Sequence, residues 1–126
     1  MLRACWRVLR PGGRMAFYTI FIAEGLSERD YRRAARARGP GITSWRRQQS
    51  DLLRSAGFVE IEELDLTDEF LRVARAWLAA RSRRAAELRQ AEGAEEFEQR
   101  LRESRAGVRA IEAGLIRRAL FVARRP

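Results

Sequence analysis

The spacing of apolar residues predicts a helix and then a strand at the start of the chain. Four apolar residues recur at helical spacing: Leu2, Cys5, Trp6 and Leu9. The Pro11-Gly12-Gly13 break ends that helix, because proline disfavours helical geometry in the preceding residue and glycine permits a tight reversal. Residues 15–22 form a near-continuous apolar run, which predicts a central strand of an α/β sheet that is covered on both faces.

The segment after this strand is polar and rich in arginine, and it predicts a surface excursion with a short helix over residues 31–37. Thr43 or Ser44 then caps a second helix that runs to Ala56. Residues 58–66 alternate apolar and acidic positions, which predicts a strand with one wetter face.

Residues 67–114 carry the longest helical pattern in the sequence. One helix runs to a break at Gly93, a second follows it, and a short apolar strand over residues 118–123 closes the chain. We therefore expect a single domain. Residues 1–66 and 115–126 supply its sheet and flanking helices, and residues 67–114 add two helices before the last strand.

Charge leaves two interpretations open. The net charge is +9, and all 26 basic residues are arginine. Residues 1–50 hold 11 arginines against three acidic residues, whereas the rest of the chain is nearly balanced. A basic first part could attract nucleic acid, so a small Arg-rich nucleic-acid-binding module is the alternative function. The sequence has no recognisable nucleic-acid motif, and an exposed, solvated arginine surface explains the same composition.

The absence of histidine excludes several kinds of site within this chain. Neither a Ser-His-Asp nor a Cys-His constellation can be assembled, and a zinc site of Cys and His ligands is excluded too. The single cysteine, Cys5, permits no internal disulfide, which favours a reducing, cytoplasmic setting. The longest apolar run, Met15 to Ala23, is too short to cross a membrane.

Two short motifs in order carry a resemblance to a known family. Leu9-Arg10-Pro11-Gly12-Gly13 stands before the first strand, and Ala56-Gly57-Phe58 stands before the second. In this respect the chain resembles the C-terminal half of the class I S-adenosylmethionine-dependent methyltransferases. The resemblance implies an α/β fold, a partial Rossmann-like methyltransferase sheet made of the family's fifth, seventh and sixth strands. The last strand lies antiparallel between the other two. The resemblance also implies that residues 1–126 are a single partial domain, in which residues 67–114 are a helical insertion or lid.

The same resemblance implies that the cofactor-binding half is absent. The family holds S-adenosylmethionine with a Gly-rich loop after the first strand, an acidic residue ending the second, and residues near the fourth. All of these precede the part that this sequence resembles, so no cofactor-binding residue is carried over. We expect no metal site, and the resemblance assigns no catalytic residue. We expect a fragment that is inactive alone and binds no S-adenosylmethionine, from an enzyme that methylates a small-molecule acceptor. A partner chain or a preceding segment would supply the missing half.

Part of an acceptor site is expected at the carboxyl ends of the strands, where open α/β sheets bind ligands. Trp45 and the first insertion helix, through Phe70 and Trp77, could close over this site. The candidate substrate-binding residues are Thr19, Phe21, Ile22, Trp45, Phe70 and Trp77. Core packing is the stronger explanation for each of these residues, because aromatic residues at helical or strand spacing usually belong to the core. Tyr18 and Thr19 could also orient a nucleophile, with Glu24 as a proton acceptor.

A strand that has lost its neighbour exposes unpaired backbone groups. The resemblance places the strand over residues 15–22 beside a fourth strand that this sequence does not contain. An apolar edge of this kind invites pairing with another chain, so we expect self-association. We expect neither a membrane nor nucleic acid as a partner.

Overall fold

The computed structural model describes residues 1–37 and 48–126. Within these ranges the chain forms six helices and three strands, in the order α1 (Leu2–Val8), β1 (Arg14–Ile22), α2 (Glu28–Ala37), α3 (Gln49–Ser55), β2 (Val59–Asp65), α4 (Thr67–Arg83), α5 (Ala85–Glu92), α6 (Ala94–Glu112) and β3 (Ile116–Arg124). The predicted cap at Thr43 or Ser44 lies outside the described residues.

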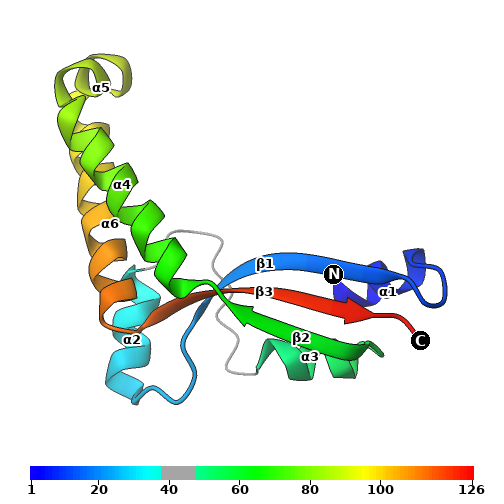
Figure 1. The fold of residues 1–126 in the computed structure, drawn as a ribbon. Coiled ribbons are helices and arrows are strands. Elements are labelled where there is room, and N and C mark those ends of the chain that lie inside the picture. The colour runs from blue at the N-terminus through cyan, green and yellow to red at the C-terminus, as the bar shows by residue number, and fades with distance from the viewer. Residues whose placement is uncertain (38–47) are drawn as a thin grey trace.

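The three strands form one sheet with the order β1-β3-β2, and β3 is antiparallel to both neighbours (Figure 1). Phe121 of β3 faces Phe17 of β1, and Leu120 faces Leu64 of β2. This arrangement confirms the prediction that the closing strand inserts antiparallel between the first two. The strand extends further toward the N-terminus than its apolar run, because Arg117 and Arg118 continue the pairing with β1.

One face of the sheet is covered by α1 and α3 (Figure 1). Alternate residues of the strands point into this core, where Phe17 and Phe121 stack with ring centroids 5.5 Å apart. Leu53 of α3 and Phe58 are buried against them, and Trp6 of α1 packs at the margin. The predicted apolar stripe of α1 therefore serves this layer.

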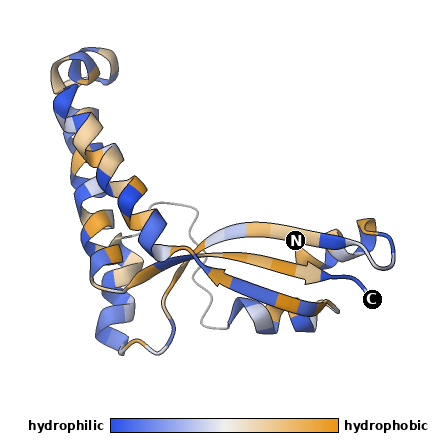
Figure 2. Cartoon of the chain, viewed as in Figure 1, coloured by the Kyte–Doolittle hydropathy of each residue, from blue (hydrophilic) through white to orange (hydrophobic). Residues whose placement is uncertain are grey.

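The opposite face of the sheet is largely open, which corrects the expectation that β1 is covered on both faces. Tyr18 of β1 is 58% exposed and Leu64 of β2 is 57% exposed. β1 is also an edge strand among the described residues, and not a central one. Figure 2 shows that β1 and β3 are apolar along most of their length. An unbroken apolar run thus marks a strand suited to burial, whether or not this chain supplies both covering layers.

Helices α4, α5 and α6 form an arm that projects from one end of the sheet (Figure 1). Gly93, with φ +91°, separates α5 from α6 as predicted. A further break at Arg84, between α4 and α5, was not predicted. Near the tip, Phe97 is fully buried, and the Glu92 carboxylate pairs with Arg81 at 2.7 Å.

The base of the arm packs on the carboxyl end of β1 through a second apolar core. Helix α2 joins this core through Ala34, which is fully buried, and β1 joins it through Ile22. Helix α2 begins at Glu28, three residues before the predicted start. The Ser27 hydroxyl accepts a hydrogen bond from the Asp30 N–H at 3.1 Å, and this cap explains the earlier start.

Strand β2 is irregular where it begins. Its pairing with β3 shifts register between Val59 and Glu62, and Glu60 has φ +49°. These two features define a β-bulge, which locally breaks the period-2 pattern of the strand.

Candidate functional site

The candidate site lies where β1 and β2 end and the arm begins. Both strands are antiparallel to β3, so they run in the same direction and their carboxyl ends share one end of the sheet. Ile22 of β1 faces Ile116 there, and α4 starts two residues after Asp65 of β2. This is the end of an open α/β sheet at which ligands bind.

On the open face at this end, one arginine lies between two aromatic rings. The guanidinium carbon of Arg118 is 4.9 Å from the Tyr18 ring centroid and 5.9 Å from the Phe70 ring centroid. Ile20 of β1 faces Arg118 in the register, and strand alternation places Tyr18 on the same side of the sheet. Phe70 comes from the first turn of α4.

Backbone and hydroxyl contacts fix the start of α4 to β3. The Leu66 N–H donates to the Arg118 carbonyl at 2.9 Å, and the Arg118 N–H donates to the Thr67 hydroxyl at 3.2 Å. The same hydroxyl donates to the Asp65 carboxylate at 2.6 Å. Because Phe70 follows this anchor by one turn, its position over Arg118 is set by the backbone.

The neighbouring arginine points the other way and is already paired. Arg117 donates to the Asp65 carboxylate at 2.6 Å. Hydrogen bonds from Thr67 and then from Arg117 hold the pKa of Asp65 below its usual value, although partial burial opposes them. Asp65 is therefore ionised at neutral pH and engaged by two partners.

The predicted residues on the arm lie on one helix face. Phe70 is partly buried beside Arg118, Val73 is 44% exposed, and Trp77 is 68% exposed. Spacings of three and seven residues put these side chains on one stripe of α4. Phe70 therefore lies beside Arg118, and helical spacing places Trp77 on the same face of α4, two turns further along the helix.

The other predicted residues are not brought to this surface. Phe21 is 7% exposed in the core under α1 and α3, and Ile22 is 3% exposed in the core at the base of the arm. Thr19 lies on the covered side of the sheet, opposite Tyr18. Trp45 lies outside the described residues. A direct substrate contact remains a prediction for all of these residues.

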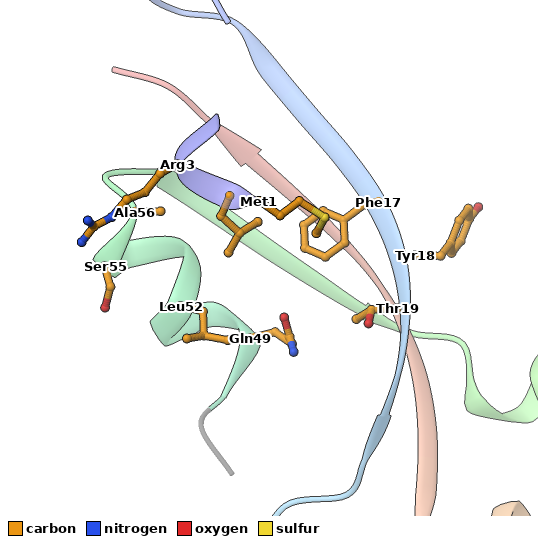
Figure 3. A pocket seen from close by; sticks show the side chains of 10 residues that line it. Met1, Arg3, Phe17, Tyr18, Thr19, Gln49, Leu52, Ser55 and Ala56 are labelled. Carbon is orange, nitrogen blue, oxygen red and sulfur yellow. The ribbon is translucent and has the colours of Figure 1, made fainter. Parts of the chain in front are cut away.

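Thr19 instead lines a groove between α1 and α3. The groove has a volume of about 500 Å³, and its walls include Phe17 of β1 and Leu52 of α3. Figure 3 shows these side chains around the groove; Tyr18 also borders the groove, and its ring lies on the other side of the β1 ribbon. The lining is mainly apolar, and Arg3 and Gln49 stand among its polar groups.

Reasoning from the sequence missed Arg118. The available signal was the pair of arginines at 117 and 118 inside a segment that continues as an apolar strand. Strand alternation sends consecutive side chains to opposite faces, so one Asp65 carboxylate cannot serve both. Predicting which arginine lacks a carboxylate required the register of β2 against β3.

Comparison with known proteins identifies solved structures that share this fold. No protein-family model and no curated protein sequence matches the chain. Solved structures do match. Phosphoethanolamine N-methyltransferase 2 from Haemonchus contortus, in complex with phosphomonomethylethanolamine and S-adenosylhomocysteine, is 16% identical with a TM-score of 0.79. The match covers 99% of this chain and 29% of that one.

Two further structures show the same likeness. A sarcosine dimethylglycine methyltransferase from Galdieria sulphuraria is 17% identical with a TM-score of 0.81, covering 98% of this chain and 45% of its own. The cyclopropane synthase MmaA2 from Mycobacterium tuberculosis is 16% identical with a TM-score of 0.82, covering 98% and 48%. The chain therefore has the fold of part of a Rossmann-like methyltransferase and spans 29–48% of the length of these proteins. The predicted fold class is confirmed.

The clustered glycines before β1 do not form a phosphate-binding loop. The clustered glycines, Gly12 and Gly13, precede β1, at the end of the sheet away from its carboxyl end. Their N–H groups already donate to the carbonyls of Arg125 and Arg10, both at 2.9 Å. A phosphate or nucleotide loop instead presents free N–H groups at a helix N-terminus.

Two other kinds of site have no counterpart in residues 1–37 and 48–126. No cluster of three or more cysteine, aspartate or glutamate side chains is arranged to hold a metal ion there. None of the helices in these ranges combines the length and the apolar character that a membrane span requires.

Proposed function

We propose that this chain is the C-terminal, acceptor-binding part of an S-adenosylmethionine-dependent methyltransferase. The observation that carries the proposal is the similarity of the whole described arrangement, sheet and arm together, to methyltransferase structures over 98–99% of the chain. The sheet order with the antiparallel last strand between its neighbours is a specific topology, so chance agreement of a simpler motif does not explain it.

In this proposal the surface of Tyr18, Phe70, Trp77 and Arg118 forms one wall of the acceptor site. Methyl transfer to a nucleophile is a direct displacement at a sulfonium carbon, and it depends on holding donor and acceptor in line. Aromatic side chains and a cation can position a small molecule without an acid or base among them. Residues 67–114 act as a lid, because α4 rises from the sheet beside this wall.

The cofactor would be held by polypeptide outside this sequence. The engaged N–H groups of Gly12 and Gly13 support this part of the proposal. Within residues 1–37 and 48–126, β1 pairs on one side only, and this supports the proposal too, because a strand of the missing half would pair on its other side. Accordingly, the 126-residue chain alone neither binds S-adenosylmethionine nor transfers a methyl group. Cys5 is a free thiol, in keeping with a reducing, cytoplasmic compartment.

The proposal is tested by the coding DNA before the first codon and by the protein it extends. We expect a Gly-rich loop after a strand, and an acidic residue after the next strand, in frame or after a frameshift. The extended polypeptide should bind S-adenosylmethionine, and the bound cofactor should raise the temperature at which the polypeptide unfolds. An extended polypeptide that folds and still shows no binding would contradict the methyltransferase assignment.

A further inference from the structure

Arg118 differs from the other partly buried arginines in what its guanidinium group contacts. Within residues 1–37 and 48–126, the arginines that are neither exposed nor fully buried are Arg81, Arg117, Arg118, Arg124 and Arg125. Four of these guanidinium groups donate to oxygen atoms of the chain. Arg81, Arg117 and Arg124 bind carboxylates, at 2.7, 2.6 and 2.5 Å, and Arg125 binds backbone carbonyls.

The Arg118 guanidinium has no such partner among the described residues. Its contacts are the rings of Tyr18 and Phe70. All 17 aspartate and glutamate residues of the chain fall within the described ranges, so no further carboxylate remains to be placed. The nearest in sequence, Asp65, is engaged by Arg117 and Thr67 on the other side of the sheet.

Aromatic contacts position a guanidinium without satisfying its hydrogen bonds. Ring faces attract the cation, but its five N–H donors lie in the guanidinium plane and still seek oxygen acceptors. A planar fork of this kind matches a carboxylate or a phosphate in a bidentate way. Tyr18 adds a hydroxyl that has no hydrogen-bond partner among the described residues.

We infer that Arg118 binds an oxyanion group, a carboxylate or a phosphate monoester, carried by the methyl acceptor. That the ligand is the methyl acceptor rests on the proposed function, but the anion site itself follows from the contacts of Arg118. Tyr18 and Phe70 hold the guanidinium at the carboxyl end of β1, and the aromatic stripe to Trp77 accommodates the remainder of the molecule.

The test follows the arginine side-chain Nε–Hε resonances of the full 126-residue chain by NMR, at constant ionic strength. Inorganic phosphate and acetate are the probes, and chloride is the reference salt. Arg118→Gln identifies its resonance by loss. Arg105→Gln is the matched control, because Arg105 is exposed on α6 and has no ion pair among the described residues.

We expect the Arg118 resonance to shift saturably, with a midpoint about tenfold lower than that of exposed arginines, as an added charge-assisted hydrogen bond produces. Tighter binding of phosphate than of acetate would indicate that the acceptor carries a phosphate monoester. Tighter binding of acetate would indicate a carboxylate. A resonance that moves no more than that of Arg105 would overturn the inference.

A second variant keeps the test decisive if Arg118→Gln unfolds. Tyr18→Ala retains the cation and removes one ring and the hydroxyl, so anion affinity at Arg118 should fall while circular dichroism stays unchanged. Unaltered affinity in this variant would contradict the role of Tyr18 in positioning the cation. Anion binding at Arg118 in a protein whose extended form binds no S-adenosylmethionine would retain the site and reject the proposed function alone.

Discussion

Arg125 and Trp6 are separated by 119 positions in the sequence, yet the Arg125 guanidinium carbon lies 3.8 Å from the centroid of the Trp6 ring. The same guanidinium donates to the Trp6 carbonyl at 2.9 Å and to the carbonyl of Leu9 at the end of α1. The last residues of the chain therefore cap the first helix, whose final carbonyls have no partners within the helix.

Replacing this cap should destabilise the fold. Arg125→Lys keeps a charge but loses the planar fork, so it should lower the free energy of unfolding by about 1.5–3 kcal/mol, the value of hydrogen bonds to charged groups. Urea unfolding followed by circular dichroism measures the change. Arg105→Lys, on the exposed face of α6, should stay within about 0.5 kcal/mol of the parent. Equal effects at the two positions would contradict the capping role.

Two glycines should respond to alanine in opposite directions. Gly57 has φ +95°, and a Cβ there would lie 3.1 Å from Nε1 of Trp6. Gly57→Ala should therefore destabilise by about 1 kcal/mol or more. Gly107, inside α6, has nothing within 4 Å of an added Cβ, so Gly107→Ala should stabilise by about 0.5–1 kcal/mol. Thermal unfolding of both variants checks the signs. Stabilisation by Gly57→Ala would contradict the positive φ of Gly57 and its close approach to Trp6.

Acid should weaken the junction between β2 and α4. The pKa of Asp65 is lowered in the folded state by Thr67 and Arg117. Its contribution is complete above the unfolded pKa, about 3.9, and is lost as pH falls through the lower folded pKa. Asp65→Asn should cost up to about 1 kcal/mol near neutral pH, because the group is half exposed, and the difference should shrink in acid. Asp68→Asn is the control, since Asp68 has no ion pair among the described residues. A pH-independent difference for Asp65→Asn would contradict this assignment.

The motifs predicted the topology better than they predicted which surfaces are covered. The glycine turn before β1 and the glycine before Phe58 fix where strands begin, because few residues adopt positive φ. Burial depends on neighbours that the local pattern does not identify. Phe21 and Ile22 were predicted at a site and lie in cores, whereas Arg118 lies on the open face through the register of β3. The break at Arg84 has no glycine or proline to mark it.

Self-association through the edge of β1 should appear as salt is added. The net charge of +9 repels copies of the chain at low ionic strength, and salt screens that repulsion. Light scattering should show a molar mass that rises with salt and protein concentration. Ala16→Lys places a charge on exposed β1 and should reduce association, whereas Ala79→Lys on α4 should not. A monomer at every salt concentration would contradict the prediction.

Titration calorimetry with S-adenosylmethionine tests the central claim most directly. The 126-residue chain should give no saturable heat, because the glycine N–H groups before β1 are already bonded within the fold. The polypeptide extended by the preceding coding sequence should bind the cofactor with a stoichiometry of one. Saturable binding by the 126-residue chain alone would contradict the claim that the cofactor site lies outside it.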